Sequence, residues 1–376
     1  MKILFMGDIF LGGDLMCDSS RLEINSALFW QSGIKIANFE QPISNNSIIV
    51  EKSTLHTNSS VIPLLKRLNI SAVNIANNHI QDKGDEGIIE TIDHLDQENI
   101  AHFGAGKNII QAKEPFRIGN DLYLLGYCDF GRSYLKNVQI ATEVIPGVNP
   151  LRIDSILEDL DRMPKNSKAI LFFHWGREHV WLPPMRDIQL AKRMLDHENV
   201  LMIVGVHCHR IQGYLEHNGK RAYLSLGNFL FPNFFIQPPN QIYYPSTRPE
   251  KFAITRQYHR VNNLTYKKWR IVNRISLLVS FDPDTLTYIH KLTYQDDNTP
   301  DVSEVGGLIE KTYQIWIYLL NLSYKFPEPV YKILEITSNI ISYSVWYIQI
   351  VLFYLTQNGI LWTLKFLHSK IFHQRE

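Results

Sequence analysis

Three histidines stand directly after apolar runs of the sequence. His174 follows four apolar residues in ILFFHWGREH, and His207 and His209 follow another run in MIVGVHCHRIQG. Residues two apart in an extended chain point to the same side, so the two later rings are expected to face one way. Clustered imidazoles at the end of a buried strand would repel if charged and leave N–H groups unpaired if neutral. Metal ligation resolves both difficulties, although a core histidine is the plainer interpretation of each residue alone.

Carboxylates and amides follow three more apolar runs. Asp8 ends the run in FMGDIFLGG, Glu40 ends the run in IANFEQPIS, and Asn77, Asn78 and His79 follow the run in VNIANNHIQDKGDEG. Taken alone, each segment has a plainer interpretation as a helix cap, a turn or a surface group. Taken together with the histidines, they indicate a mixed oxygen and nitrogen ligand set for two divalent ions, Mn²⁺, Fe or Zn²⁺. The expected metal ligands are Asp8, Glu40, Asn78, His174, His207 and His209, with the His79 imidazole placed to act as a general acid.

These residues need a sheet that brings strand ends together. Short apolar runs alternate with amphipathic stretches, and Ile88, Ile92 and Leu95 recur at helical spacing within 84–98. Strands separated by helices of this length predict an α/β fold with a largely parallel sheet whose strand ends carry the site. The expected strands are 2–6, 34–38, 71–76, 122–127, 169–174, 201–206 and 222–226, with helices at 84–98 and 186–197 and a hairpin over 274–295.

The composition of the chain limits the classes of function that the site could have. The chain has 376 residues, of which 45% are hydrophobic, and its 38 Lys and Arg nearly balance 37 Asp and Glu. This balance disfavours a general nucleic-acid binder. Three widely spaced cysteines indicate neither a disulfide framework nor a zinc ribbon. Because the start MKILFMGD is typical of a core strand and not of a signal peptide, we expect a cytoplasmic catalytic part, with membrane association through the C-terminus as an option.

The later part of the chain divides into a basic segment, a linker and a tail. Residues 243–275 carry eight Lys or Arg against one acid, interleaved with aromatic residues. This pattern suits either a solvated loop or a surface that binds anions. We expect one domain over 1–297 with a basic insertion over about 237–275, a linker over 298–310 and a helical tail over 311–376. The expected substrate-binding residues are Asn77, Glu178, Arg256, Arg260, Lys267 and Arg270.

The tail is apolar and aromatic. Residues 336–364 include no Asp, Glu, Lys or Arg, but Ser, Asn, Gln and Thr interrupt the run and weaken the case for a spanning helix. We therefore expect helices that lie on or dip into a membrane, with basic residues at the end. The alternative is a helical pair that packs on the main domain or on a second subunit.

The ordered segments GDIFLGG, ANFEQPIS, NNHIQDKGDEG, HWGREH and GVHCHRIQGYLEHNGKRAYLSLGNFLF resemble the CapA family of poly-γ-glutamate and capsule biosynthesis proteins, over residues 1 to about 297. That family is similar to calcineurin-like metallophosphoesterases. The resemblance implies a four-layer α/β/β/α sandwich, here followed by the helical, apolar tail. It also implies that Asp8 and His209 hold one metal, that Glu40 bridges, and that Asn78, His174 and His207 hold the other. His79 would donate a proton or contact the transition state.

One position departs from the wider superfamily. Where those enzymes have a further histidine two residues after the first Asp, this chain has Phe10. That substitution removes one ligand from the first metal and leaves two functions open. The first is a metal-dependent hydrolase or transferase that acts on a phosphoester or amide bond in the synthesis of an anionic polymer. The second is a non-catalytic, membrane-associated scaffold of a polymer synthase complex. An anionic polymer or phosphorylated substrate is the expected partner, and a nucleic acid is not expected.

Overall fold

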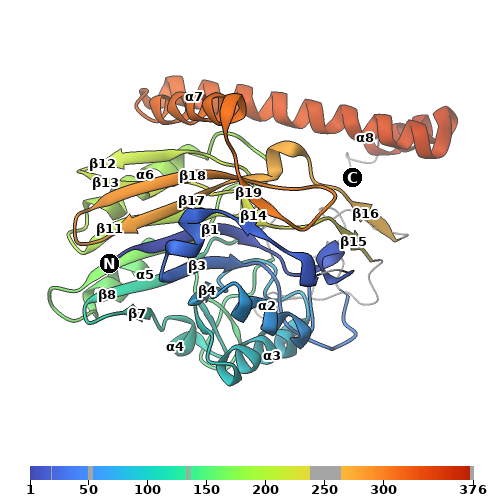
Figure 1. The fold of residues 1–376 in the computed structure, drawn as a ribbon. Coiled ribbons are helices and arrows are strands. Elements are labelled where there is room, and N and C mark those ends of the chain that lie inside the picture. The colour runs from blue at the N-terminus through green and yellow to red at the C-terminus, as the bar shows by residue number, and fades with distance from the viewer. Residues whose placement is uncertain (18, 50–53, 133–134, 136, 238–263, 373–376) are drawn as a thin grey trace.

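A computed structural model describes residues 1–17, 19–49, 54–132, 135, 137–237 and 264–372. Two large sheets occupy its centre, with helices on either side (Figure 1). Arg256 and Arg260 of the basic segment lie outside the described residues. The protein thus has the mixed α/β character that the alternating pattern predicts.

The first sheet has nine strands and combines parallel and antiparallel pairs. β1 is parallel to β3, which is parallel to β4, whereas β17 and β18 form an antiparallel hairpin beside β1. The residues of β1, ILFMGDI, are all buried, as expected of a near-continuous apolar strand covered on both faces. The strands are β1 (Ile3–Ile9), β2 (Ile24–Asn25), β3 (Ile34–Phe39), β4 (Ala72–Asn74), β5 (Ala101–Phe103), β14 (Asn228–Leu230), β17 (Ile275–Asp282), β18 (Thr287–Gln295) and β19 (Val302–Glu304).

The second sheet has six strands, and its centre is parallel. β10 lies between β8 and β11 and is parallel to both, so the ends of these strands meet at one edge. The strands are β7 (Phe116–Ile118), β8 (Leu122–Cys128), β10 (Lys168–His174), β11 (Val200–Val206), β12 (Tyr214–His217) and β13 (Lys220–Tyr223). Two small pairs complete the strands, β6 (Ala105–Gly106) with β9 (Gly147–Val148) and β15 (Phe234–Ile236) with β16 (Thr265–Lys267).

The buried apolar side chains form three large clusters. One contains residues of the first sheet and of α1, α2 and α3, and a second contains residues of both sheets, such as Phe5 and Phe172. The third contains residues of the second sheet, α5, α6 and the C-terminal helices. The helices are α1 (Ala27–Gln31), α2 (Ile62–Arg67), α3 (Gly84–Gln97), α4 (Ile109–Ala112), α5 (Ile153–Asp161), α6 (Met185–Asp196), α7 (Gly307–Ser323) and α8 (Glu328–Phe372).

Helix α3 shows how sequence pattern and packing agree. Ile88, Ile92 and Leu95 are fully buried on one face, as their spacing predicts. Asp85 and Glu86 lie in the first turn, where negative charge is favourable next to the helix dipole. The chain then turns at Asn99, whose φ of 57° is tolerated by asparagine. The loop that carries Asn77, Asn78 and His79 connects β4 to this helix.

The C-terminal segment differs in two ways from the expected linker and tail. The expected linker, 298–310, contains β19, which pairs with both β18 and β2, and α7 begins at Gly307. Strand pairing holds this segment because β19 lies between β18 and β2 and pairs with both. Leu320, Tyr324 and Tyr331 then pack in the third buried cluster. The first part of the tail therefore lies against the main body of the protein.

Side-chain hydrogen bonds reinforce this packing. The Tyr331 hydroxyl donates to the carbonyl of Pro183 at 2.7 Å, and the backbone N–H of Tyr214 donates to Asn321 at 2.8 Å. Figure 1 shows α7 and α8 along one side of the molecule, with the far part of α8 extending past β16. Among the described residues, we find no helix whose length and hydropathy would allow it to cross a bilayer.

Candidate metal centre

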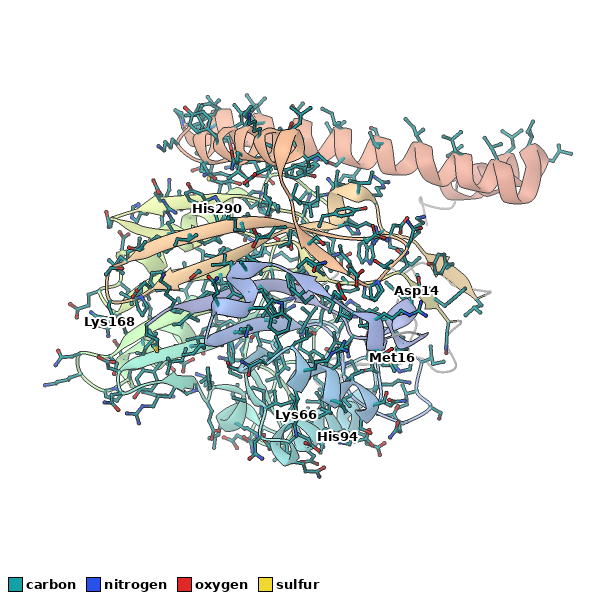
Figure 2. All side chains as sticks on the ribbon, in the orientation of Figure 1. Asp14, Met16, Lys66, His94, Lys168 and His290 are labelled. Carbon is teal, nitrogen blue, oxygen red and sulfur yellow. The ribbon has the colours of Figure 1, made fainter. Side chains whose placement is uncertain are left out.

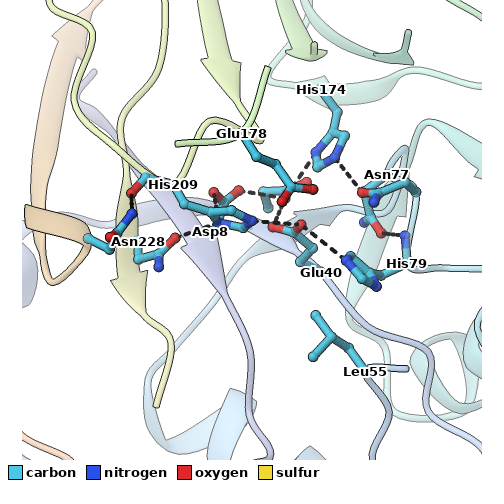
Figure 3. Close-up of polar contacts among 12 residues, drawn as sticks. Asp8, Glu40, Leu55, Asn77, His79, His174, Glu178, His209 and Asn228 are labelled. Atoms are coloured by element: carbon cyan, nitrogen blue, oxygen red, sulfur yellow. Dashed lines mark hydrogen bonds and ion pairs between the residues drawn. The ribbon is translucent and has the colours of Figure 1, made fainter. Parts of the chain in front are cut away.

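The expected metal ligands come together where strands of both sheets end (Figure 3). Asp8 lies near the end of β1, Glu40 follows β3, and Asn78 follows β4. His174 ends β10, while His207 and His209 follow β11. Every one of these side chains is buried. The six residues expected from the sequence therefore surround one small volume.

A close approach of two backbones positions Asp8. The N–H of Asp8 donates to the carbonyl of Gly227 at 2.9 Å, and Asp8 is paired in register with Asn228 of β14. A Cβ at Gly7 would lie only 1.8 Å from that carbonyl oxygen, so glycine is required here. Asn38 then donates to Asp8 Oδ1 at 2.8 Å, which fixes the carboxylate.

Glu40 occupies the centre of the arrangement. Glu40, His174 and His207 can each offer a ligand atom within 4.8 Å of the others, and so can Asp8, Glu40 and His209. Glu40 Oε1 lies 3.7 Å from His209 Nε2 and 3.9 Å from His79 Nε2. Because Glu40 belongs to both groups, it lies where a carboxylate would bridge two ions.

The turn after β11 has an unusual backbone. His207 has φ of 89° and His209 has φ of 56°, so the chain is not extended here and the expectation of an extended HCH segment is wrong. Two left-handed histidines separated by Cys208 carry a strain of about 1–3 kcal/mol each. The turn nevertheless brings the rings together, with 6.3 Å between the centroids of His207 and His209. His174 lies closer still to His207, at 4.5 Å.

Amides contact two of the candidate histidine ligands. His209 Nδ1 lies 2.8 Å from Asn228 Oδ1, so the Nδ1–H donates there and Nε2 is directed toward Glu40. His174 Nε2 lies 2.8 Å from Asn78 Oδ1, which places two potential ligand atoms side by side. Cys208, between the two later histidines, is buried, and its thiol donates to the carbonyl of Val180.

The electrostatics of the site favour a cation. Burial, followed by the charge of Asp8, raises the pKa of Glu40 well above its ordinary value. Burial alone would lower the pKa of His209, but its contact with Asp8 outweighs burial and raises it. Asp8 Oδ2 lies 3.3 Å from His209 Nδ1 and Glu40 Oε1 lies 3.7 Å from His209 Nε2, but neither buried oxygen accepts a hydrogen bond from the described residues. Two adjacent buried carboxylates with such oxygens are costly without a positive ion, so this donor set fits divalent metals.

His79 forms a dyad with Asp82 at the edge of this site. Its Nδ1 donates to Asp82 Oδ2 at 2.6 Å, and its Nε2 faces Glu40. The backbone N–H of Leu55 also donates to Asp82 Oδ2, at 2.8 Å, which fixes the carboxylate. An imidazole oriented in this way by a carboxylate can transfer a proton through Nε2.

The expected substrate-binding residues that the structure describes lie in several different places around the candidate centre. Asn77 donates to the carbonyl of Phe39 at 2.9 Å and accepts from the N–H of His79 at 3.0 Å, so its side chain braces the loop. Glu178 points toward Glu40 and His174 (Figure 3). Lys267 and Arg270 are half-buried near His209, and the two other arginines lie outside the described residues.

Phe10 belongs to an aromatic wall beside the site. Its ring lies 5.2 Å from that of Phe231 and 5.5 Å from that of Phe234. Trp269 completes the wall, 5.1 Å from Phe231 and 5.1 Å from the His209 ring. Phe10 is therefore a core residue that packs next to the candidate centre and offers no ligand atom.

Sequence reasoning missed the residues that hold the ligands. Asn38 donates to Asp8 and is itself held by Asn74, which donates to Asn38 Oδ1 at 2.8 Å. Asn228 orients His209, and Asp82 orients His79. Their positions in the sequence could have indicated two of them. Asn38 lies two residues before Glu40, and Asn228 lies in the motif LGNFLF.

Comparison with known proteins identifies relatives of this arrangement. The family described as "Bacterial capsule synthesis protein PGA_cap" matches residues 2–233. The chain is 28% identical over 242 residues to the PGA biosynthesis protein CapA of Bacillus subtilis (strain 168), covering 60% of this chain and 62% of that protein. It is 28% identical over 204 residues to the capsule biosynthesis protein CapA of Bacillus anthracis, covering 52% of this chain and 49% of that protein. The matches thus span about half to three fifths of the length of these relatives.

Proposed function

Because the chain belongs to the PGA_cap family of bacterial capsule synthesis proteins, we propose that it acts in the synthesis of an anionic capsule polymer of the poly-γ-glutamate type. We propose further that it is a dinuclear-metal-dependent hydrolase or transferase acting on a phosphoester or amide bond. The observation that carries this proposal is the sharing of Glu40 between two buried ligand groups. Such sharing is the arrangement that a two-metal site requires.

Each residue has a defined part in this proposal. Asp8 and His209 would hold one ion, His174, His207 and Asn78 the other, and Glu40 both. Bound ions would supply charge neutralisation on the reacting oxygen and a water acidified enough to attack at neutral pH. His79 protonates the leaving group through Nε2, since Asp82 holds its Nδ1. Glu178 stands beside Glu40, and its charge contributes to the raised pKa of Glu40, so it adds a third carboxylate for substrate or ion.

The distribution of the buried clusters supports a metallophosphoesterase-like sandwich of four layers. One cluster contains side chains of both sheets, and the other two combine one sheet each with helices. This architecture would bring two sets of strand ends to one edge, which suits a site built from both sheets.

Metal content tests the proposal directly. We expect about two equivalents of Mn, Fe or Zn per chain by inductively coupled plasma mass spectrometry after loading. The double variant His207→Ala/His209→Ala should lose at least one equivalent. His217→Ala is the matched control, because His217 lies on β12 and contacts Asp196. Absence of metal from the loaded wild-type protein would contradict the proposal.

A scaffold within a synthase complex is the second candidate, and Phe10 favours it. A core aromatic residue stands where a ligand would complete the first ion, so one site could be weak. The two candidates differ in turnover. The metal-loaded enzyme should hydrolyse bis(p-nitrophenyl) phosphate or a γ-glutamyl anilide, and the double variant should not. A metal-loaded protein with no turnover of either substrate class would support the scaffold.

We also propose that the outward side of α7 and α8 contacts a membrane surface. Ile315, Leu319 and Leu322 share one side of α7 and remain 62%, 48% and 38% exposed. Figure 2 shows side chains along the outer side of α7 and α8 that face away from the sheets. The uncharged stretch 336–364 and the Lys and Arg after it suit an interfacial helix on anionic lipid.

Vesicle sedimentation tests the membrane contact. The full chain should sediment with phosphatidylglycerol vesicles, and Ile315→Gln/Leu319→Gln/Leu322→Gln should weaken sedimentation several-fold. Ile110→Gln is the control, because Ile110 is 71% exposed on α4, away from these helices. Equal sedimentation of the triple variant and wild type would contradict a lipid-binding surface. A stable wild-type dimer that does not sediment with vesicles would also contradict it.

A further inference from the structure

Three cations beside the candidate metal centre lack an ion-pair partner in the part of the chain that the structure describes, although the charge of Glu178 acts on Lys267. The side chains of Arg210, Lys267 and Arg270 make no hydrogen bond or ion pair with the described residues. Other cations of the same segment behave differently, since Lys268 and Arg274 each contact Asp297 at 2.5 Å. Within this segment, Lys267 and Arg270 therefore differ from the paired cations Lys268 and Arg274.

Arg210 is the most unusual of the three. Its side chain is only 4% exposed, and its Nε is buried without a hydrogen bond among the described residues. Its guanidinium lies 4.6 Å from the ring centroid of Trp181, a contact that stabilises the cation but leaves its N–H donors unused. A buried Nε–H without an acceptor is costly, so this position suits an arginine whose guanidinium receives an anion.

All three cations are tied to His209. Arg210 follows it in the chain, and Asn273, in the short turn after Arg270, donates to the carbonyl of His209 at 2.8 Å. Lys267 Nζ lies 5.1 Å from the Trp269 ring, which is itself 5.1 Å from the His209 ring. The three residues therefore belong to segments that meet at His209.

The electrostatics around His179 agree with this convergence. His179 lies 5.7 Å from His209 and 5.9 Å from Trp269 between ring centroids. Burial and the positive charges of Lys267, His209, Arg210 and Arg270 hold its pKa well below the ordinary value. Glu178 Oε2 lies 3.7 Å from His179 Nε2, and the charge of Glu178 also acts on Lys267.

We propose that Arg210, Lys267 and Arg270 form a subsite for a second oxyanion of the substrate, a phosphate or carboxylate, on the His209 side of the centre. This subsite rests on the proposed function and adds to it. The substrate would be a polyanion, and its second oxyanion would fix the orientation in which it binds at the centre. The opposite side, with Asn78 and His79, offers an amide and an imidazole. Guanidinium groups suit this role because their paired N–H donors match two oxygens of a phosphate or carboxylate.

Anion binding to the metal-stripped full chain tests the subsite. Inorganic phosphate and γ-glutamylglutamate are titrated at fixed ionic strength by isothermal titration calorimetry. We expect at least one probe to bind wild type, and Arg210→Gln and Arg270→Gln each to weaken that binding about tenfold. Arg210→Lys should retain part of the affinity. Arg162→Gln removes the same charge from an exposed arginine paired with Glu158 and should bind as wild type does.

The outcomes separate this subsite from the metal proposal. Because the ions are removed first, loss of the metal centre does not affect the titration. Failure of both probes to bind wild type at millimolar concentration would overturn the subsite. So would an Arg210→Gln protein, shown to be folded by its thermal transition, whose affinity stays within twofold of wild type. If the Arg210→Gln protein does not fold, the anion affinity of Arg270→Gln decides whether the subsite exists.

Discussion

His209 Nδ1 and Asn228 Oδ1 lie 2.8 Å apart, and this contact decides which ring nitrogen faces the candidate metal centre. Asn228 is available for it because β14 pairs with β1 and sets Asn228 beside Asp8. An amide that receives the Nδ1–H keeps Nε2 unprotonated, which is the form that binds a metal.

Asn228→Ala should therefore weaken metal binding about 10- to 100-fold without abolishing folding. The affinity is measured by competition with a fluorescent chelator, and Asn228→Asp should retain much of it because a carboxylate also accepts the Nδ1–H. Asn218→Ala serves as control, because Asn218 contacts Asp196 at the surface. Unchanged affinity in the Asn228→Ala protein would show that the contact does not select the tautomer.

Glu40→Gln should have opposite effects with and without metal. In the metal-free protein, burial and Asp8 raise the pKa of Glu40, so removing this carboxylate should stabilise folding by about 1–3 kcal/mol. In the metal-loaded protein, loss of the shared ligand should reduce the stabilisation that metal gives. Chemical denaturation with and without chelator measures both effects. Glu158→Gln, at an exposed position, should change neither, and a destabilised metal-free Glu40→Gln protein would contradict the interpretation.

Asp82→Asn should lower turnover about a hundredfold while metal content stays unchanged. The asparagine no longer holds His79 in the orientation that directs Nε2 toward Glu40. His79→Gln should have a similar effect, and the double variant should lose little more, because the two residues act as a unit. Steady-state rates with bis(p-nitrophenyl) phosphate measure this, with Asp96→Asn as a surface control. If the losses of turnover in Asp82→Asn and His79→Gln were fully additive in the double variant, the two residues would have independent roles.

His56 should make folding sensitive to mild acid. Burial, aided by the charge of Lys83, lowers the pKa of His56 from 6.5 to about 4. Between these values the unfolded chain binds a proton that the folded protein does not, so the free energy of unfolding falls as the pH drops. The contribution is about 1–2 kcal/mol between pH 7 and pH 5. Urea denaturation should show a smaller pH dependence for His56→Asn than for wild type, and equal slopes would refute the assignment.

Much of the fold is readable from local pattern. The apolar runs at β1, β3, β8, β10 and β11 and the spacing within α3 and α6 identified elements close to their observed bounds. The pairing of β19 within 298–310 could not be predicted, because a short polar strand has no periodicity of its own and gains its pairing from β18 and β2.

The sequence by itself determined which residue types follow which strands, because an apolar run and the polar residue after it are local features. Tertiary structure alone decided that Glu40 belongs to two ligand groups, since its contacts with His174 and His209 join residues more than 130 positions apart. It also decided the left-handed turn at His207 and His209 and the roles of Asn38 and Asn228. Such contacts depend on strand register and on packing between two sheets, and neither is encoded in the spacing of residues along the chain.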